Sequence, residues 1–364
     1  MAKGVHGLSR INWRSIFGRK RIFWLFNLLL SLLLGGLLII AIGFDRDLKR
    51  IPPDHRIGNR ESNVKGLKEK GFPFSFLVIG DTQGSQRGED LIKLALRNGQ
   101  YSFMIHLGDF VKKPDRWDHL YFLTEMTTEV KPPFPVFLVP GNHDIDYAAV
   151  RIRDRERRMT REGFDSFYGA RSFHFVFNQC LFILTEIDPQ NPDGYLNYLK
   201  GVLSTKGEGR KHIFVFIHYP PKLFEYIHDF FPKEEEFFSL LESYKVTACF
   251  FGHYHGYWRG QRNGINYIIA GGGGRLKETQ SEWGKFHHIL KITASPNGVT
   301  EEMIALQEGF SIEDLFEERV FVHLLPALQG RVWILYGFTF FIMIWGIGSL
   351  ILLIKSFRKA THSL

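Results

Sequence analysis

The chain has 364 residues, of which 45% are hydrophobic and 23% charged, and these values exclude a globally disordered protein. Its net charge of +8 would suit a nucleic-acid-binding protein, but the excess of basic over acidic residues is located at the two ends. Residues 1–21 contain six basic side chains and residues 355–364 contain three, with no acidic residue in either stretch. The remaining chain is therefore close to neutral, and nucleic acid is not expected as a partner.

Two uncharged stretches, residues 22–44 and 332–354, are each long enough to span a bilayer, which takes about 20 apolar residues. A cleaved signal peptide would have an apolar core of about 7–15 residues and a small-residue cleavage site, so the first stretch is interpreted as an uncleaved anchor. The basic tails predict cytoplasmic ends by the positive-inside rule. The segment between the spans is then expected outside the cytoplasmic membrane, although five basic residues within 46–60 oppose this orientation.

The sequence between the spans divides into three parts. Residues 45–72 are polar, contain Pro52-Pro53 and are predicted to be a linker. Residues 73–300 are predicted to form the folded domain, and residues 301–331 connect it to the second span. Helices and strands alternate early in the domain and strands dominate later, which indicates an α/β core with packed sheets.

Apolar runs that end at Gly, Asp, Asn or His give the expected strands. In chain order these are residues 74–79, 103–107, 135–142, 173–177, 180–187, 212–217, 248–251, 265–270 and 286–293. Helices are expected near residues 91–98, 115–130 and 233–244. The arginine-rich segment 151–171 is expected to be a solvated, ion-paired helix, with a surface for an anionic substrate or lipid headgroup as the alternative.

Side chains with metal-binding atoms follow five of the expected strands: Asp81, Asp109, Asn142, His218, and His253 with His255. One Asp or His after a strand means little, because turns favour such residues. Repetition at five strand ends is more than turns explain. A set of two carboxylates, one amide oxygen and three imidazoles suits transition metals such as Mn, Fe or Zn.

In this order, five elements resemble the motif set of the calcineurin-like metallophosphoesterases: Gly80-Asp81, Gly108-Asp109, Gly141-Asn142-His143-Asp144, His218 and Gly252-His253-Tyr254-His255. The resemblance covers roughly residues 74–295. It implies a two-sheet α/β/β/α sandwich, here flanked by N- and C-terminal transmembrane helices, with two divalent metal ions at the strand ends.

The resemblance also implies the ligands of both metals. Asp81 and His255 would hold the first metal, and Asp109 would bridge the two. The second metal would have three further ligands: Asn142, His218 and His253. Two metals about 3.5–4 Å apart can clamp a phosphoryl group and activate a hydroxide for attack on it.

Within the same motif, His143 would act as general acid or transition-state stabiliser, oriented by Asp144. An unperturbed pKa of about 6.5 suits imidazole to that role. One position departs from the pattern, since many family members have His where this chain has Gln83. Either the carbonyl oxygen of Gln83 completes a weaker first site, or Gln83 only forms hydrogen bonds behind the ligands.

Other conspicuous residues are interpreted as structural. His106 lies within a strand between apolar neighbours, and His174 and His212 are also assigned to the fold. His287 and His288 are adjacent in a strand and cannot both face one side. The glycines at 271–274, followed by Arg275, lack the strand–loop–helix context of a phosphate-binding loop.

The sequence therefore predicts a membrane-anchored phosphoric ester hydrolase that cleaves a phosphomonoester or phosphodiester through a metal-activated hydroxide. Anchoring near the bilayer suggests a phospholipid-like or lipid-linked substrate, with soluble phosphoesters as an alternative. From another class, the domain could be a non-catalytic metal-containing binding module, but such a module would not need His143 and Asp144. A transporter is disfavoured because the two spans contain no ionisable residue.

Overall fold

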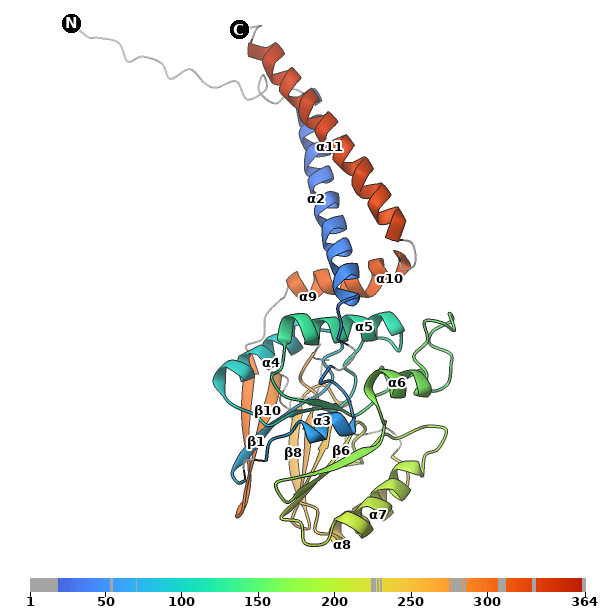
Figure 1. The fold of residues 1–364 in the computed structure, drawn as a ribbon, viewed down its shortest axis with the longest axis vertical. Helices are drawn as coiled ribbons and strands as arrows, with labels where there is room; N and C mark the ends of the chain where they lie inside the picture. Colours follow the sequence, from blue (N-terminus) through green and yellow to red (C-terminus); the bar gives the residue numbers. More distant parts are fainter. Residues whose placement is uncertain are drawn as a thin grey trace, which may run out of the picture. The chain divides into compact units, whose positions relative to one another are not determined.

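The computed structural model describes residues 19–52, 55–69, 71–223, 231–274, 286–306, 312–328 and 332–361, together with Ile227, Asp229, Leu276 and Gly284. Most of the predicted N-terminal tail, the last three residues and Arg275 lie outside these residues. The chain divides into two compact units: one contains the helices α2 and α11, and the other is Arg50–Pro326 (Figure 1).

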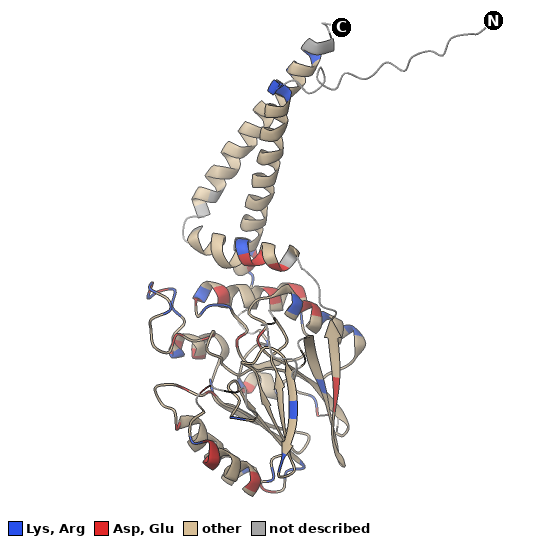
Figure 2. Ribbon diagram, turned by 180° about the vertical axis from the view of Figure 1, so that it is seen from behind, with Lys and Arg blue, Asp and Glu red and all other residues tan. Residues whose placement is uncertain are grey.

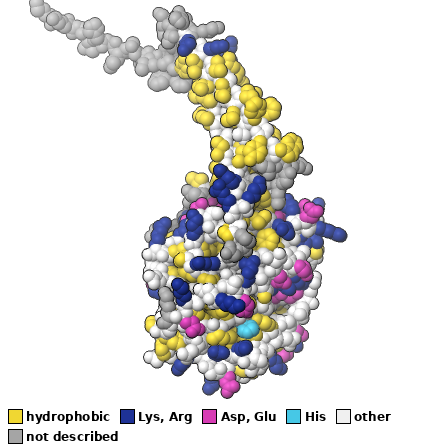
Figure 3. Space-filling model, in the orientation of Figure 1, with side chains coloured by type: hydrophobic (Ala, Val, Ile, Leu, Met, Phe, Trp, Pro, Cys, Tyr) yellow, Lys and Arg dark blue, Asp and Glu magenta, His cyan; other side chains and the backbone are white. Residues whose placement is uncertain are grey.

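The first unit is a pair of long apolar helices, α2 (Arg19–Leu48) and α11 (Val332–Thr361). They run antiparallel, because the Arg21 guanidinium near the start of α2 donates to the carbonyl of Ser356 near the end of α11, at 3.0 Å. Both are long and apolar enough to cross a membrane. Basic residues lie where the start of α2 meets the end of α11 (Figure 2). Along the rest of this helix pair most of the visible surface is hydrophobic (Figure 3).

The second unit contains two sheets. The first has the order β11-β10-β1-β2-β3, with β1 (Phe74–Ile79), β2 (Met104–His106), β3 (Val136–Leu138), β10 (His287–Ser295) and β11 (Gly298–Leu306). The second has the order β4-β5-β6-β7-β9-β8, with β4 (Phe173–Phe177), β5 (Cys180–Leu184), β6 (His212–Ile217), β7 (Ala248–Phe251), β8 (Tyr257–Arg262) and β9 (Ile265–Ala270). Within them, β1, β2 and β3 are parallel, as are β5, β6, β7 and β9.

Helices cover the outer face of each sheet. Over the first sheet lie α4 (Gln86–Asn98), α5 (Arg116–Thr124), the π-helical turn η1 (Glu125–Val130) and α6 (Arg161–Tyr168). Over the second lie α7 (Gly194–Lys206) and α8 (Glu234–Ser243). The short helix α3 (Glu61–Lys65) precedes β1, and α9 (Ile312–Glu317), the π-helical η2 (Glu318–Leu324) and α10 (Leu325–Leu328) follow β11. The predicted α/β/β/α sandwich is confirmed.

The space between the sheets is filled mainly by phenylalanine. Phe76 and Phe103 of the first sheet stack with their ring centroids 5.2 Å apart, and Phe175 and Phe182 of the second do so at 4.9 Å. Across the layer, Phe103 meets Phe182 edge-to-face at 5.0 Å. Such pairs stabilise a core beyond the area they bury, and here they hold the two sheets in one relative position.

The departures from prediction concern polar or exposed elements. Strands β8 and β11 were not expected, because both are edge strands whose residues are mostly half-buried or exposed and include charged side chains. Helix α7 was also missed. Residues 151–160 form turns, so the helix predicted over 151–171 exists only as α6. Helix α6 has eight residues and begins after Thr160, whose side chain caps it by accepting from the amide of Gly163.

Candidate metal centre

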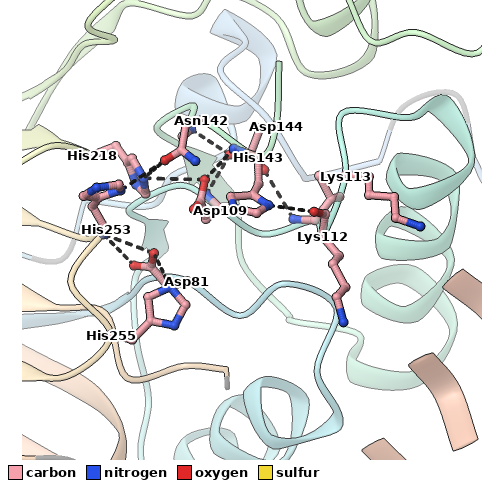
Figure 4. A network of polar contacts seen from close by, with 12 residues as sticks. Asp81, Asp109, Lys112, Lys113, Asn142, His143, Asp144, His218, His253 and His255 are labelled. Carbon is pink, nitrogen blue, oxygen red and sulfur yellow. Dashed lines mark hydrogen bonds and ion pairs between the residues drawn. The ribbon is translucent and has the colours of Figure 1, made fainter. Parts of the chain in front are cut away.

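Six of the seven side chains predicted as metal ligands, all except Gln83, converge from both sheets (Figure 4). Asp81, Asp109 and Asn142 follow β1, β2 and β3 of the first sheet. From the second sheet, three histidines follow β6 and β7: His218, His253 and His255. Parallel strands place their carboxyl ends at one edge of a sheet, and in this fold the two edges meet.

The loops that present these ligands have an unusual backbone. Asp81, Asp109 and His253 have φ angles of +59°, +53° and +67°, in the left-handed region that non-glycine residues rarely adopt. Such conformations cluster at functional sites. The glycine before each is needed for close approach: a Cβ on Gly252 would lie 2.6 Å from Oδ2 of Asp81.

The ligands predicted for the second metal form a tight group. Oδ1 of Asn142 lies 3.2 Å from Nε2 of His218 and 3.1 Å from Nδ1 of His253. Nε2 of His218 is also 3.5 Å from Oδ1 of Asp109. The potential ligand atoms of Asp109, His218 and His253 all lie within 4.8 Å of one another.

The protonation of this group suits a divalent cation. His218 is buried and its Nδ1 donates to the carbonyl of Leu107 at 2.8 Å, so the Nε2 lone pair faces the centre. Burial lowers the pKa of His218 to about 4, which keeps the imidazole neutral. Burial raises the pKa of Asp109, but the neighbouring His218 and His143 outweigh this and hold it below its ordinary value. The centre thus gathers lone pairs and a carboxylate charge, and this donor set fits a transition metal.

The residues predicted for the first metal include a buried Asp–His pair. Nε2 of His255 lies 3.6 Å from Oδ1 of Asp81, and both side chains are buried. Both carboxylate oxygens of Asp81 accept from the amide of His253, at 3.1 and 2.9 Å. Gln83 has a half-buried side chain that makes no hydrogen bond among the described residues, while its amide donates to the carbonyl of Asp109. Whether Gln83 binds the first metal stays a prediction.

His143 lies at the rim of this centre. Its Nδ1 donates to the carbonyl of Lys112 at 2.6 Å, and its amide donates to Oδ1 of Asp109 at 2.8 Å. Its Nε2 is therefore directed toward the ligands, 3.9 Å from Oδ2 of Asp109. With 24% of its side chain exposed, His143 can meet a solvent-borne ligand.

A sequence model of the calcineurin-like phosphoesterases matches residues 74–257, which is half of the chain and includes every residue of this centre. The chain belongs to the calcineurin-like phosphoesterase family. A comparison with curated proteins finds no match.

Solved structures share the fold of this phosphoesterase domain. Plasmodium GAP50, described as the anchor in the inner membrane complex, is 17% identical with a TM-score of 0.50, over 66% of this chain and 87% of GAP50. The purple acid phosphatase PPD1 from yellow lupin, Lupinus luteus, is 15% identical with the same TM-score, over 65% of this chain and 52% of the phosphatase. At these identities the likeness concerns the fold alone.

Asp144 does not orient the His143 ring directly, and this corrects the sequence-based expectation. Its buried carboxylate accepts four backbone N–H groups: Asp109 and Gly141 at 2.7 Å, Phe110 at 3.0 Å and Val111 at 3.2 Å. Asp144 therefore fastens the loop after β2 to the loop after β3. It acts on His143 through the backbone, while the carbonyl of Lys112 fixes the ring.

Two contributors were missed by sequence reasoning. The carbonyl of Lys112 has no sequence signal, because every residue has one. Asp229 accepts from Nε2 of His253 at 3.2 Å and from the hydroxyl of Tyr254 at 2.7 Å. A carboxylate behind a ligand histidine fixes the ring and raises its basicity. Asp229 lies far from His253 in sequence and follows no buried strand, so only the folded chain identifies it.

The arginine-rich segment is ion-paired, as expected, but mostly not helical. Arg157 pairs with Asp115, Arg158 with Asp146, Arg161 with Asp188, and Arg171 with both Asp165 and Glu186. Arg151 donates to the carbonyl of Asn142, beside the centre. The segment thus stabilises the fold next to the site.

The histidines assigned to the fold bond to groups other than the predicted metal ligands. Nε2 of His106 pairs with the hydroxyl of Thr82 at 3.0 Å, and burial lowers the pKa of His106 to about 3. His174 pairs with the hydroxyl of Tyr198, and His212 with the carbonyl of Ser295. His287 and His288 are both buried in β10.

Proposed function

We propose that this protein is a membrane-anchored phosphoric ester hydrolase that binds two divalent metal ions. The observation that supports this most is the convergence of one carboxylate, one amide oxygen and two imidazoles at the strand ends, with Nε2 of His143 directed at the same place. The proposed ligands are Asp81, Gln83 and His255 for one ion, Asn142, His218 and His253 for the other, and Asp109 for both. Mn, Fe or Zn fits this set.

When bound, the two ions would neutralise the phosphate charge and lower the pKa of a water molecule. The protein itself holds the ligands and moves a proton. The bond from Nδ1 of His143 to the Lys112 carbonyl leaves Nε2 free to carry a proton toward a leaving oxygen. His143 also keeps Asp109 in place through its amide.

The substrate is a phosphomonoester or phosphodiester, and the two apolar helices favour one at the bilayer, such as a phospholipid-like or lipid-linked phosphate. The basic ends of these helices favour a cytoplasmic location for both termini, and hence a phosphoesterase domain outside the cytoplasmic membrane. The domain limits 73–300, with a linker before and a connector after, belong to the same proposal.

The test is hydrolysis of phosphomonoesters and phosphodiesters by the full-length protein in detergent, with and without Mn²⁺. We expect metal-dependent turnover that falls about 10²–10⁴-fold in His143→Gln, with bound metal unchanged. His174→Gln is the matched control, since His174 bonds Tyr198 away from the centre, and should retain full turnover.

Two results would contradict the proposal. Equal turnover in His143→Gln and the parent would remove His143 from the chemistry. Two bound metals per chain without turnover on soluble esters or on native lipid extracts would favour the non-catalytic binding module. The described role of Plasmodium GAP50 as an anchor is the reason to include that second outcome.

A further inference from the structure

The segment that leads from the phosphoesterase domain toward α11 has two different faces. It consists of α9 and η2, residues 312–324, and is called the α9–η2 segment below. It lies outside the part of the chain that matches the family. One face is fixed to the domain by polar and aromatic contacts, and the other exposes apolar side chains.

The inner face binds the helical layer over the first sheet. Asp314 accepts from the hydroxyl of Ser85, the cap of α4, at 2.8 Å. The carbonyl of Phe321 accepts from the indole of Trp117 at 2.7 Å, and the Phe321 ring stacks on Tyr121 with centroids 5.3 Å apart. These contacts fix which face of the segment is turned outward.

The outer face is apolar with a basic residue at its end. Ile312 is 69% exposed, Leu315 46% and Phe316 36%. Together with the exposed Arg319, they follow the spacing i, i+3, i+4, i+7 that places side chains on one face of a helix. Leu324, 46% exposed, ends the segment. Arg319 makes no ion pair among the described residues.

Chain connectivity indicates what covers this face. Seven residues lie between Leu324 and Val332, the first residue of α11, so the eight steps from one to the other can reach at most about 28 Å when fully extended. At the other junction, Ile51 packs against the helical layer over the first sheet only three residues after α2 ends at Leu48. Both connections to the apolar helices therefore leave from the layer that holds the α9–η2 segment.

Basic residues adjoin the same region. Arg157 donates to the carbonyl of Pro326 just beyond the segment, at 3.4 Å, and so joins the arginine-rich loop to it. In that loop Val150 is 74% exposed, and Arg153 and Arg155 are exposed. Asp154 and Glu156 are exposed in the same loop. An apolar helix face with an arginine at its end is the composition of helices that lie in the interface of a bilayer.

We propose that the α9–η2 segment lies in the headgroup region of the bilayer, with Ile312, Leu315 and Phe316 inserted and Arg319 among lipid phosphates. This rests on the membrane anchoring in the proposed function. The segment would hold the mouth of the metal centre near the lipid surface, because Lys112, whose carbonyl fixes His143, pairs through its side chain with Glu318 of the segment.

The test is the depth of single spin labels in the full-length protein, reconstituted in vesicles of phosphatidylethanolamine and phosphatidylglycerol. Labels at Leu315→Cys and Phe316→Cys are compared with Leu350→Cys in α11 and Lys200→Cys on α7, all exposed positions. Apolar oxygen partitions into lipid and a water-soluble nickel complex does not. We expect oxygen to relax the labels at 315, 316 and 350 more than nickel does, with the reverse order at 200.

The outcomes separate the two proposals. Suppose that nickel relaxes the labels at 315 and 316 more than oxygen does, while oxygen relaxes the label at 350 more. The proposal that the segment lies in the bilayer interface would then be wrong, and the membrane anchoring would stand. If nickel relaxed the label at 350 more than oxygen did, the membrane anchoring itself would be wrong. If neither reagent reached 315 and 316, a protein surface would cover this face, either a second copy or another partner, and the lipid assignment would be wrong.

Discussion

The two halves of the candidate metal centre differ in how firmly the protein holds them. Around the second metal position, Asn142, His218 and His253 touch one another, and each has a further protein contact that fixes it. Around the first, Asp81 meets His255 at 3.6 Å and accepts from the amide of His253, but the side chain of Gln83 makes no hydrogen bond within the part of the chain that the structure describes. The comparison teaches that one set of sequence motifs can build two metal positions of different kinds. The protein itself fixes the ligands of one position, whereas the ligand geometry of the other depends more on the bound metal.

The largest effect is expected from the residue common to both halves. Asp109→Asn removes the charge next to both metal positions, so metal content should fall in both, and turnover should fall by well over the roughly 10–100-fold that loss of a supporting residue produces. Elemental analysis and kinetics measure this. Loss of a single metal, with the other fully bound, would show that Asp109 does not bridge.

A large effect should also follow from removing the support of the second half. In Asp144→Asn, an NH₂ group would face backbone donors that now have a carboxylate, which should lower the free energy of unfolding by about 3 kcal/mol. The affinity for the second metal should fall more than the affinity for the first. Denaturant unfolding and metal titration measure both.

The matched control is Asp115→Asn. Asp115 is also buried and also accepts a backbone N–H, that of Trp117, but its carboxylate pairs with Arg157 and, among the residues that the structure describes, bonds to none of the centre. It should destabilise the fold without changing metal affinity. Equal losses of affinity in both variants would mean that Asp144 acts only through global stability.

A moderate effect is expected at the weaker half. Gln83→His would replace an amide oxygen by an imidazole, which borderline metals prefer. The affinity for the first metal should therefore rise about tenfold, or about 1.4 kcal/mol. Gln83→Ala should weaken it and leave the second metal unchanged. Calorimetric titration resolves the two sites. Identical isotherms for all three chains would exclude Gln83 as a ligand.

The effect that is smallest at neutral pH concerns the histidine behind Asp144. His119 is buried with Nε2 at 2.9 Å from the Asp144 carbonyl, and burial lowers its pKa to about 3. Below the unfolded pKa of about 6.5 the unfolded chain binds a proton that the folded chain does not, so His119 should reduce stability by about 1.4 kcal/mol for each pH unit between 6.5 and 3. His119→Asn should show a shallower decline by that amount. An unchanged slope would show that His119 is charged in the fold.

The sequence predicted the strands and their polar ends because both depend on local patterns. Buried strands such as β6 are continuous apolar runs, and the residue after each run is visible in the chain. The edge strand β8 mixes Arg, Gln and Gly with aromatic residues, so its pairing with β9 decides its conformation. That the ends of two different sheets meet came from the family resemblance, not from any pattern of residues.

The role of Asp144 was beyond sequence reasoning for a related reason. Three of its four partners are backbone amides about 35 residues away, and amides at those positions look like any others. The same holds for the Lys112 carbonyl that fixes His143. Ligand side chains can be recognised in the sequence by residue type, whereas the backbone groups that orient them can be identified only in the folded chain.

The aromatic layer between the sheets acts as a spacer for the chemistry. Asp109 comes from one sheet and His218 from the other, so the gap between their ligand atoms is set by the rings packed between, among them Phe103 and Phe182. Protein interiors are as dense as crystals and transmit strain. The thickness of this layer, which is not itself in contact with the metal position, would therefore help to determine which radius of metal ion fits the centre.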